Sequence, residues 1–530
     1  MTTDITNPKH LKEPDRPWWR SRWCLLVGAF LASGCLAVLV GLASYLVMGP
    51  TTADSWYNRY LILYVAMALF CVAIFIVYRD ELEAHPDFAF FLLMLTLTVG
   101  GSLLFDVNQV SWDQGNHFGH TLNWIGSFEP HVLDGAEYRL RYMNFNEHHT
   151  NLAELAEYRQ WLDAATYPSD KVATFSWGNL FQRLSSLPSF LVYWPLRMLG
   201  VSFSWAYVLS KLPSALIYSL LCYRAMREVK SGKMIVAAVA MIPTALFLAE
   251  NYSYDFWLNG FTLWAVAAVV GAMQRSQPVT ARTMAKILVL FVLGLLVKAV
   301  YAPLALIALL IPRRRFTSEK GAVWARVAVV LVTLGILATF AVPMMVGGAG
   351  EGDVRGGSDV NAAEQVFYVL ADFPHYIFGV LLPFMLDYLN PVHCGEYLGQ
   401  YAYLGIAPAP FYLVSFALLI FTCVTDHSEE DAAICTWKSR TVTGVVCWVC
   451  LCLAASALYV SFTPVGSSTI AGFQFRYIIP VLFPMLIFYG LPNVGARVRA
   501  RAPRYNVWVL ALLTAVPLLE TWALYVSLVG

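Results

Sequence analysis

Charged residues are scarce in this sequence. Asp, Glu, Lys and Arg account for 13% of the 530 residues, whereas soluble proteins contain about 25%. Hydrophobic residues make up 58%, and the mean hydropathy is +0.59. This composition excludes an ordinary soluble domain and predicts an integral membrane protein. The net charge is only +1, so no nucleic-acid partner is expected.

The cysteines do not form the pattern of a disulfide framework. Most of the ten lie in apolar runs, Cys435 lies in a charged loop, and only Cys394 falls in a segment expected outside the membrane. The stretch "CWVCLC" (447–452) has no histidine or acidic residue beside it. Packing inside a helix is therefore favoured over metal binding.

No cleavable signal peptide is expected at the N-terminus. The polar start ends at Trp23, and the apolar run from Cys24 to Met48 is too long for the core of a signal peptide. It predicts a true membrane span.

Ten further runs are long and apolar enough to be spans: 60–78, 88–105, 204–223, 234–250, 256–273, 324–346, 404–424, 441–461, 475–491 and 506–528.

Two other apolar regions need a specific interpretation. The run 186–200 is short and contains Pro195 and Arg197, so we expect an interfacial or re-entrant helix. The run 287–311 has basic residues at both ends. Two short helices that meet at "KAVYAP" would keep both ends on the cytoplasmic side and place Lys298 at the outer face. The total is about 13 crossings.

The short basic loops give the orientation. The N-terminal segment and the loops 224–233, 275–286, 312–316 and 496–504 are rich in Lys and Arg, so they are predicted to be cytoplasmic. The protein is then a multi-pass protein of the cell membrane, with its N-terminus inside and its C-terminus outside. No internal repeat is evident, which disfavours a secondary transporter.

Three large segments lie outside in this topology: a first outer loop 106–203, a second outer segment 347–403 and the turn 462–474. The stretch "TNLAELAEYRQWLDAA" (150–165) has helical spacing. The predicted division is a cytoplasmic segment 1–23, a transmembrane hairpin 24–87, a main membrane domain 88–495, and a basic loop with the last helix, 496–530.

Polar side chains from four separate places gather at the outer face in this topology. Cations there could neutralise a phosphate leaving group, and a carboxylate could deprotonate an acceptor hydroxyl. Charged residues at or near a membrane interface usually form pairs, face water or bind a ligand. The candidates are Asp113, His117, Glu250, Asp255, Lys298, Gln474, Arg476 and Tyr477.

Each candidate also has a structural explanation. Asp113 could cap the helix that follows it, and Asp255 could cap a helix that begins at Phe256. His117 and His120 could bind a metal with Asp113, although packing is commoner for such histidines. Lys298 could reach lipid headgroups. Arg476 could contact headgroups or pair with Asp255.

The order of several motifs resembles a large bacterial membrane-protein family, domain of unknown function 2142. The motifs are "DQGNHF", "SF…YW" within 186–200, "AENYSYDFWLNG", "LLVKAVYAPL" and "TPVGSSTIAGFQFRYIIPVLFP". The resemblance covers roughly residues 90–495, and the element GxQxRYxxP is its most specific part. The family in turn resembles the GT-C glycosyltransferases, multi-pass enzymes that use polyprenyl-phosphate sugars.

This resemblance implies an all-α, GT-C-like bundle with a large first outer loop. It assigns Asp113 as the loop acid, Lys298 as the cation at the tip of a helical hairpin and 186–200 as a juxtamembrane helix. Two residues depart from the family pattern: Gln114 stands where Glu is usual, and Phe475 where Gly is usual. Three spans precede Asp113, whereas the GT-C acid usually follows the first.

The expected function is glycosyl transfer to a cell-envelope glycan or lipid-linked acceptor. Asp113 would be the general base, Lys298 and Arg476 would hold the donor phosphate, and Gln474 and Tyr477 would orient it. Asp255 would line the acceptor side.

The pattern assigns no metal ligand, and a divalent cation stays open as a cofactor. Membrane lipids are further partners. The alternatives are an exporter of lipid-linked glycan and a non-catalytic component of an envelope assembly.

Overall fold

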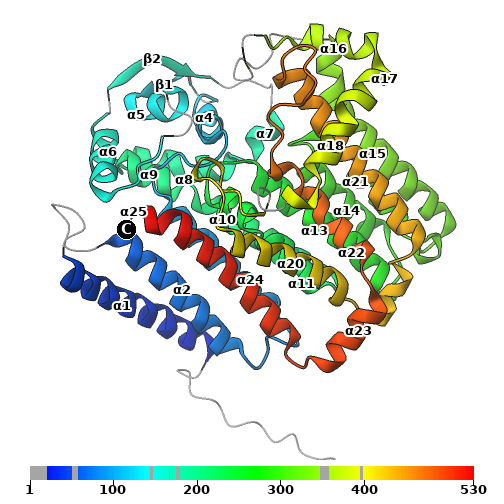
Figure 1. Ribbon diagram of the computed structural model, residues 1–530, viewed down its shortest axis with the longest axis horizontal. Helices are drawn as coiled ribbons and strands as arrows, with labels where there is room; N and C mark the ends of the chain where they lie inside the picture. The colour runs from blue at the N-terminus through cyan, green and yellow to red at the C-terminus, as the bar shows by residue number, and fades with distance from the viewer. Residues whose placement is uncertain are drawn as a thin grey trace, which may run out of the picture.

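The computed structural model describes residues 21–49, 58–127, 129–143, 147–165, 167–174, 180–346, 357, 359–393 and 398–529. Most of the predicted cytoplasmic segment 1–23 therefore lies outside the described residues, as do Cys394 and much of the stretch 347–358. The described chain is a helical bundle with one small β-hairpin (Figure 1).

Eight helices are long and apolar enough to cross a membrane, and the number rises to 11 if each bent pair is one span. The predicted all-α polytopic membrane fold is therefore confirmed. The unbroken spans come from α1 (Arg22–Met48), α2 (Arg59–Tyr78), α3 (Asp87–Leu104), α9 (Phe203–Leu209) with α10 (Leu212–Glu228), α13 (Asp255–Gln274), α15 (Glu319–Val346), α21 (Trp437–Phe462) and α24 (Tyr505–Thr521).

Broken or short helices account for the difference from the predicted count of about 13. The pair α11 (Lys233–Ala240) and α12 (Pro243–Glu250) bends by 58°, and the pair α22 (Ile479–Tyr489) and α23 (Pro492–Arg501) bends by 84°. A proline begins the second helix of each pair, where its missing N–H interrupts the hydrogen-bond ladder. The helix α20 (Ala409–Thr425) is apolar but short.

The second outer segment contains a third bent pair, which the sequence did not predict. The helix α16 (Ala362–Ala371) is followed by a helical stretch Phe373–Tyr388, which includes α17 (Phe373–His375) and α18 (Leu382–Tyr388), at an angle of 100°. The two parts together are apolar enough for a broken span or a re-entrant loop. Residues 362–388 are therefore more apolar and more helical than an ordinary outer loop.

The predicted hairpin around Lys298 is confirmed. Its first arm is α14 (Ala281–Leu295) and its second is a 3₁₀ helix, η3 (Ala299–Leu310). The two ends of the hairpin meet, because Val279 N donates a hydrogen bond of 2.6 Å to Arg315 O. A 3₁₀ helix rises about 2.0 Å per residue and an α-helix about 1.5 Å, so arms of 12 and 15 residues are about equally long.

The first outer loop folds into a small unit above the bundle, at the upper left of Figure 1. It includes α4 (Gln114–Ile125), β1 (His131–Asp134), α5 (Gly135–Tyr138), α6 (Leu152–Ala164), β2 (Pro168–Ala173), α7 (Leu180–Leu184) and α8 (Leu187–Met198). The strands β1 and β2 pair antiparallel. The predicted helix at 150–165 is α6, and Asn151 caps it.

The helix α8 is the short run that the sequence placed at the interface. It is not among the helices long and apolar enough to span. Arg197 near its end donates a 2.7 Å hydrogen bond to Asp134 on β1, which ties α8 to the outer unit. This placement agrees with a juxtamembrane helix that does not cross.

A buried carboxylate joins the N-terminal hairpin to the rest of the chain. Asp106, just after α3, forms ion pairs with Arg59 of α2 and Arg159 of α6, and Tyr60 donates to it. The ammonium of Lys211 donates to the Asp106 carbonyl at 2.8 Å. The hairpin of α1 and α2 is therefore integrated into the bundle by polar contacts as well as apolar ones.

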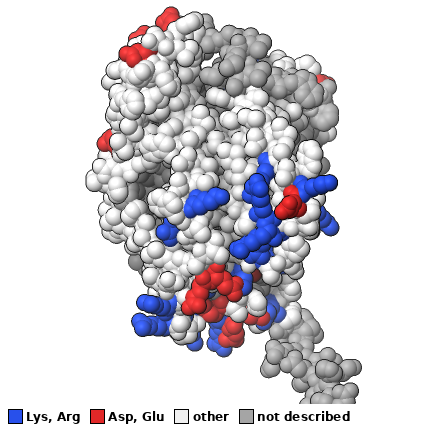
Figure 2. Space-filling model, turned by 90° about the vertical axis from the view of Figure 1, so that its right-hand side faces the viewer, with Lys and Arg blue, Asp and Glu red and all other residues white. Residues whose placement is uncertain are grey.

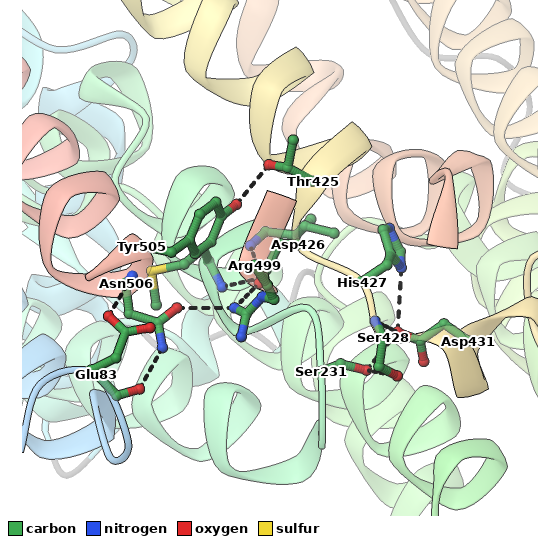
Figure 3. Close-up of polar contacts among 12 residues, drawn as sticks. Glu83, Ser231, Thr425, Asp426, His427, Ser428, Asp431, Arg499, Tyr505 and Asn506 are labelled. Atoms are coloured by element: carbon green, nitrogen blue, oxygen red, sulfur yellow. Dashed lines mark hydrogen bonds and ion pairs between the residues drawn. The ribbon is translucent and has the colours of Figure 1, made fainter. Parts of the chain in front are cut away.

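Polar contacts also hold together the opposite end of the bundle, where α23 lies in Figure 1. Asp426 accepts hydrogen bonds from Met234 N and Ile235 N in the first turn of α11 and pairs with Arg499 (Figure 3). Arg499 also donates to Asn506 at 2.9 Å, and Asn506 donates to the Glu83 carbonyl at 2.7 Å. Figure 2 shows charged side chains concentrated toward this lower end on one face.

Candidate functional site

Arg476 lies at the centre of a buried charge cluster. The GxQxRYxxP motif forms a tight turn, η10 (Phe475–Tyr477), directly before α22. The guanidinium of Arg476 donates to Asp113 at 2.9 Å and to Asp255 at 3.3 Å. Its side chain is only 4% exposed. Arg476 therefore joins two acids that the sequence places far apart, and the pairing with Asp255 is the alternative that the sequence allowed.

Asp113 occupies the N-cap position of α4 without capping it. Its backbone is left-handed, with φ of 56°, and its side chain makes no capping hydrogen bond. The carboxylate turns to Arg476 instead and is 28% exposed, whereas Asp255 is 1% exposed. Asp113 is thus the more accessible of the two acids, and the capping explanation does not fit its geometry.

Gln114 stabilises the loop that carries Asp113. Its side-chain oxygen accepts hydrogen bonds from Val110 N and Ser111 N, both at 3.0 Å. Its amide nitrogen donates to the Tyr207 hydroxyl at 3.0 Å. An amide has both the acceptor and the donor that these contacts require, and a carboxylate has no donor. The glutamine at this position therefore has a structural role in this chain.

Lys298 lies at the tip of the α14–η3 hairpin and faces the same cluster. Its ammonium nitrogen is buried and has no hydrogen-bond partner among the described residues. It lies 3.6 Å from the centre of the Tyr477 ring and 5.7 Å from that of Tyr254. Ring faces attract the cation, but they do not supply the nitrogen or oxygen acceptor of an ordinary hydrogen bond. The ammonium of Lys298 can therefore bind an anionic ligand and donate hydrogen bonds to it.

Two cavities meet at Lys298. The first, the more polar of the two, has a volume of about 590 Å³ and is lined by Asp113, Arg476 and Gln474. The side-chain oxygen of Gln474 is buried without a partner among the described residues. The second has a volume of about 640 Å³ and a largely apolar lining from η3, α15 and α21. Lys298 and Tyr477 line both. A polar group and an apolar chain on one molecule could therefore lie in continuous space.

Three of the predicted site residues do not line the polar cavity. Asp255 lies behind Arg476 and accepts from the Ser253 hydroxyl at 3.0 Å. Glu250, at the end of α12, packs against Gly101 of α3, where an added Cβ would lie 2.2 Å from its carboxyl carbon. His117 packs edge-on against Tyr254, with ring centres 4.8 Å apart. Their contact with a substrate would be indirect.

The two histidines of α4 are uncharged in this structure at neutral pH. Burial lowers the pKa of His117 to about 3 and that of His120 to about 3, because the protein interior disfavours the charged ring. Among the described residues, no group of three or more His, Cys, Asp or Glu side chains could hold a metal ion. The alternative metal site of His117, His120 and Asp113 therefore has no support in the geometry.

Sequence reasoning missed several residues that line the site. Trp112 lies next to Asp113, and its ring centre is 5.4 Å from the Arg476 guanidinium carbon. Tyr403, the last residue of the second outer segment, and Gln182 of α7 also line the polar cavity. An aromatic beside each acid, in "SWDQG" and "SYD", was the available signal, because aromatic faces stabilise neighbouring cations.

Comparison with known families identifies the chain. The family model described as predicted membrane protein (DUF2142) matches residues 136–486, about two thirds of the sequence. The protein belongs to the DUF2142 family. The matched span of this DUF2142 protein contains Lys298, Arg476 and Asp255, and it begins after Asp113. No curated protein and no solved structure matches the chain.

Proposed function

We propose that this DUF2142 protein is a glycosyltransferase that uses a polyprenyl-phosphate-linked sugar at the outer face of the cell membrane. The acceptor is a hydroxyl of a cell-envelope glycan or of a lipid-linked saccharide. The observation that carries the proposal is the position of Lys298. Its ammonium has no hydrogen-bond partner among the described residues, and it lies where the more polar cavity of about 590 Å³ meets the apolar one of about 640 Å³.

A lipid phosphate has the two parts that this junction suits. The phosphate carries negative charge and hydrogen-bond acceptors, which the buried ammonium of Lys298 can satisfy. The polyprenyl chain is apolar and fits the cavity lined by η3, α15 and α21. The sugar would then occupy the polar cavity beside Trp112 and Asp113. An apolar ligand without an anionic group would leave Lys298 buried and unpaired.

In the proposed reaction the acceptor hydroxyl attacks the anomeric carbon of the donor sugar. The bond between that carbon and the phosphate oxygen breaks, and the bonding electron pair leaves with the polyprenyl phosphate. The acceptor loses its proton to Asp113, the more exposed of the two clustered acids. Lys298 stabilises the negative charge that develops on the leaving phosphate.

Arg476 has a different proposed role from the phosphate clamp that the sequence suggested. Two of its donors already bond to Asp113 and Asp255. It would orient the Asp113 carboxylate toward the cavity. Gln474, whose side-chain oxygen lacks a partner in the described structure, is placed to accept a hydrogen bond from the sugar.

A donor-consumption assay tests this function. The purified protein in lipid nanodiscs is incubated with a panel of radiolabelled polyprenyl-phosphate sugars and an envelope glycan fraction. The proposal predicts protein-dependent release of free polyprenyl phosphate and label in the glycan. In proteoliposomes, movement of an intact lipid-linked glycan across the bilayer without cleavage of any donor would instead identify an exporter.

A further inference from the structure

A second polar cavity lies at the opposite end of the bundle from Lys298. It has a volume of about 680 Å³ and is lined by the loops that follow α10, α13 and η3 and by the loop after α20. A smaller cavity of about 330 Å³ shares Ser276 and Arg315 with it. The α14 arm separates these cavities from the hairpin tip, and its 15 residues span about 22 Å.

Basic side chains dominate the charged lining of the two cavities. Lys230, Arg275, Arg314 and Arg315 contribute four cations, against the acids Glu430 and Asp431. Figure 2 shows basic and acidic side chains together toward this end of the molecule. The excess of positive charge in a space of this size favours an anionic ligand.

The acids in the cavity are already engaged. Asp431 is 1% exposed and accepts from the Ser231 hydroxyl at 2.6 Å and from Ser428 N at 2.9 Å (Figure 3). It also accepts from Gln274 at 3.0 Å. Glu430 pairs with Lys230. Arg275 pairs with Glu228 at 3.5 Å, so Arg314 and Arg315 are the lining cations without a carboxylate partner among the described residues.

Arg315 is held in place without a carboxylate partner among the described residues. Its guanidinium donates to the backbone carbonyls of Arg275 and of Met273, the latter at 2.7 Å. These bonds fix the side chain but do not compensate its charge. The neighbouring Arg314 is exposed and forms no ion pair within the described chain. A fixed guanidinium with remaining donors is suited to bidentate binding of phosphate oxygens.

Two exposed tryptophans lie at this end of the bundle, as expected for a surface at the level of lipid headgroups. Trp324 near the start of α15 is 71% exposed, and Trp437 at the start of α21 is 82% exposed. Each of these helices follows a loop that lines the cavities. Tryptophan concentrates at membrane–water interfaces, and basic groups at the cytoplasmic surface attract anionic lipids.

We propose that these joined cavities bind a phosphate group, presented by an anionic lipid headgroup of the cytoplasmic leaflet or by a soluble phosphate compound. The site is independent of the proposed transfer reaction, because none of its lining residues lines either of the two cavities at Lys298. A bound phosphate group would hold the cytoplasmic loops in place, or would make their conformation depend on a ligand on that side of the membrane.

The test uses the purified full-length protein and three probes: a short-chain phosphatidylglycerol, a short-chain phosphatidylcholine and inorganic pyrophosphate. Binding is followed by thermal shift. Ser276→Asp adds a negative charge where the two cavities join, and Arg314→Gln removes an exposed cation. Arg282→Gln is the matched control, because Arg282 is exposed on the same side but lines neither cavity.

We expect an anionic probe to raise the melting temperature of the wild type, with about tenfold weaker apparent affinity for Ser276→Asp and Arg314→Gln. The control should bind like the wild type. A response to phosphatidylglycerol but not to pyrophosphate assigns the site to the lipid, and the reverse assigns it to a soluble ligand. No response to either, or equal binding by all the variants, would overturn the proposal. Phosphatidylcholine binding as strong as phosphatidylglycerol binding would do the same.

Discussion

Arg476 and Asp113 form an ion pair of 2.9 Å across 363 positions of sequence. The same guanidinium reaches Asp255 at 3.3 Å, so one buried cation compensates two acids. This arrangement joins the first outer loop, the start of α13 and the turn before α22 in a single cluster. Through this cluster the loop that carries Asp113 is held against the bundle. Asp113 itself lies before residue 136, where the family match begins.

Removal of the Arg476 charge should destabilise the protein even without a ligand. Arg476→Met would leave two neighbouring carboxylates without a cation, one of them fully buried, and loss of a buried ion-pair partner costs about 3–5 kcal/mol. We expect a large fall in melting temperature in detergent. Arg476→Met combined with Asp113→Asn and Asp255→Asn should recover most of it. Equal stability of wild type and Arg476→Met would show that the cluster contributes little.

Lys298 should behave in the opposite way. Its ammonium has no hydrogen-bond partner among the described residues, so Lys298→Met should keep or slightly raise ligand-free stability. Binding of polyprenyl phosphate should weaken about tenfold or more, as for loss of a charge-assisted hydrogen bond. Titration of a fluorescent polyprenyl phosphate measures this, with the exposed Lys320→Met as control. Undiminished binding by Lys298→Met would exclude Lys298 as the phosphate anchor.

Asp113→Asn should abolish transfer while the protein stays folded. An amide cannot accept the proton of the acceptor hydroxyl, and loss of a general base typically reduces the rate by about 10²–10⁴-fold. The rate of sugar transfer to the acceptor measures the effect, with donor binding measured beside it. Asp170→Asn, at a position with an 80% exposed side chain, is the control. Wild-type turnover in the Asp113 variant would show that another group accepts the proton.

Because the histidines of α4 are buried, we expect the folded first outer loop to lose stability at acidic pH. Burial lowers the pKa of His117 to about 3, against about 6.5 in an unfolded chain. The unfolded state therefore binds more protons between these values, and stability is lost as the pH falls from about 6.5 toward 3. His117→Gln should lose less melting temperature than wild type between pH 7 and pH 5. The exposed His85→Gln should follow the wild type, and identical profiles for all three would refute this explanation.

The orientation of the bundle is open to a labelling test. Single cysteines at Asp170 and Glu364 should react with a membrane-impermeant maleimide on intact cells, and cysteines at Ser276 and Ala500 only after permeabilisation. All four positions are exposed, and a cysteine-free background removes the native thiols. Labelling at Ser276 in intact cells would reverse the orientation and move the Lys298 site to the cytoplasmic face.

Long apolar runs made the bundle predictable, because each span carries its whole signal within about 20 consecutive residues. The hairpin at Lys298 could also be predicted, since basic residues at both of its ends cannot lie on opposite sides without a charge cost. The helix pair at 362–388 was missed. Its break before Phe373 divides the apolar signal, and a 100° bend gives no single run of spanning length.

The site was less predictable than the fold. Sequence alone brought Asp113, Lys298 and Arg476 to one face but not into their pairings, which depend on how distant turns pack. The interaction of Lys298 with the Tyr477 ring rather than with a carboxylate, and the structural role of Gln114, both follow from side-chain directions that no local pattern encodes. Asp255 was a candidate for substrate contact, and its burial behind Arg476 was evident only in three dimensions.

The proposed function depends on Lys298 as the anchor of a lipid phosphate at the junction of the polar and apolar cavities. A structure of the protein with bound polyprenyl phosphate tests it most directly. We expect the phosphate within about 3 Å of the Lys298 ammonium, with the polyprenyl chain along η3, α15 and α21. A phosphate found elsewhere, with Lys298 still against the Tyr477 ring and without an anionic ligand, would contradict it.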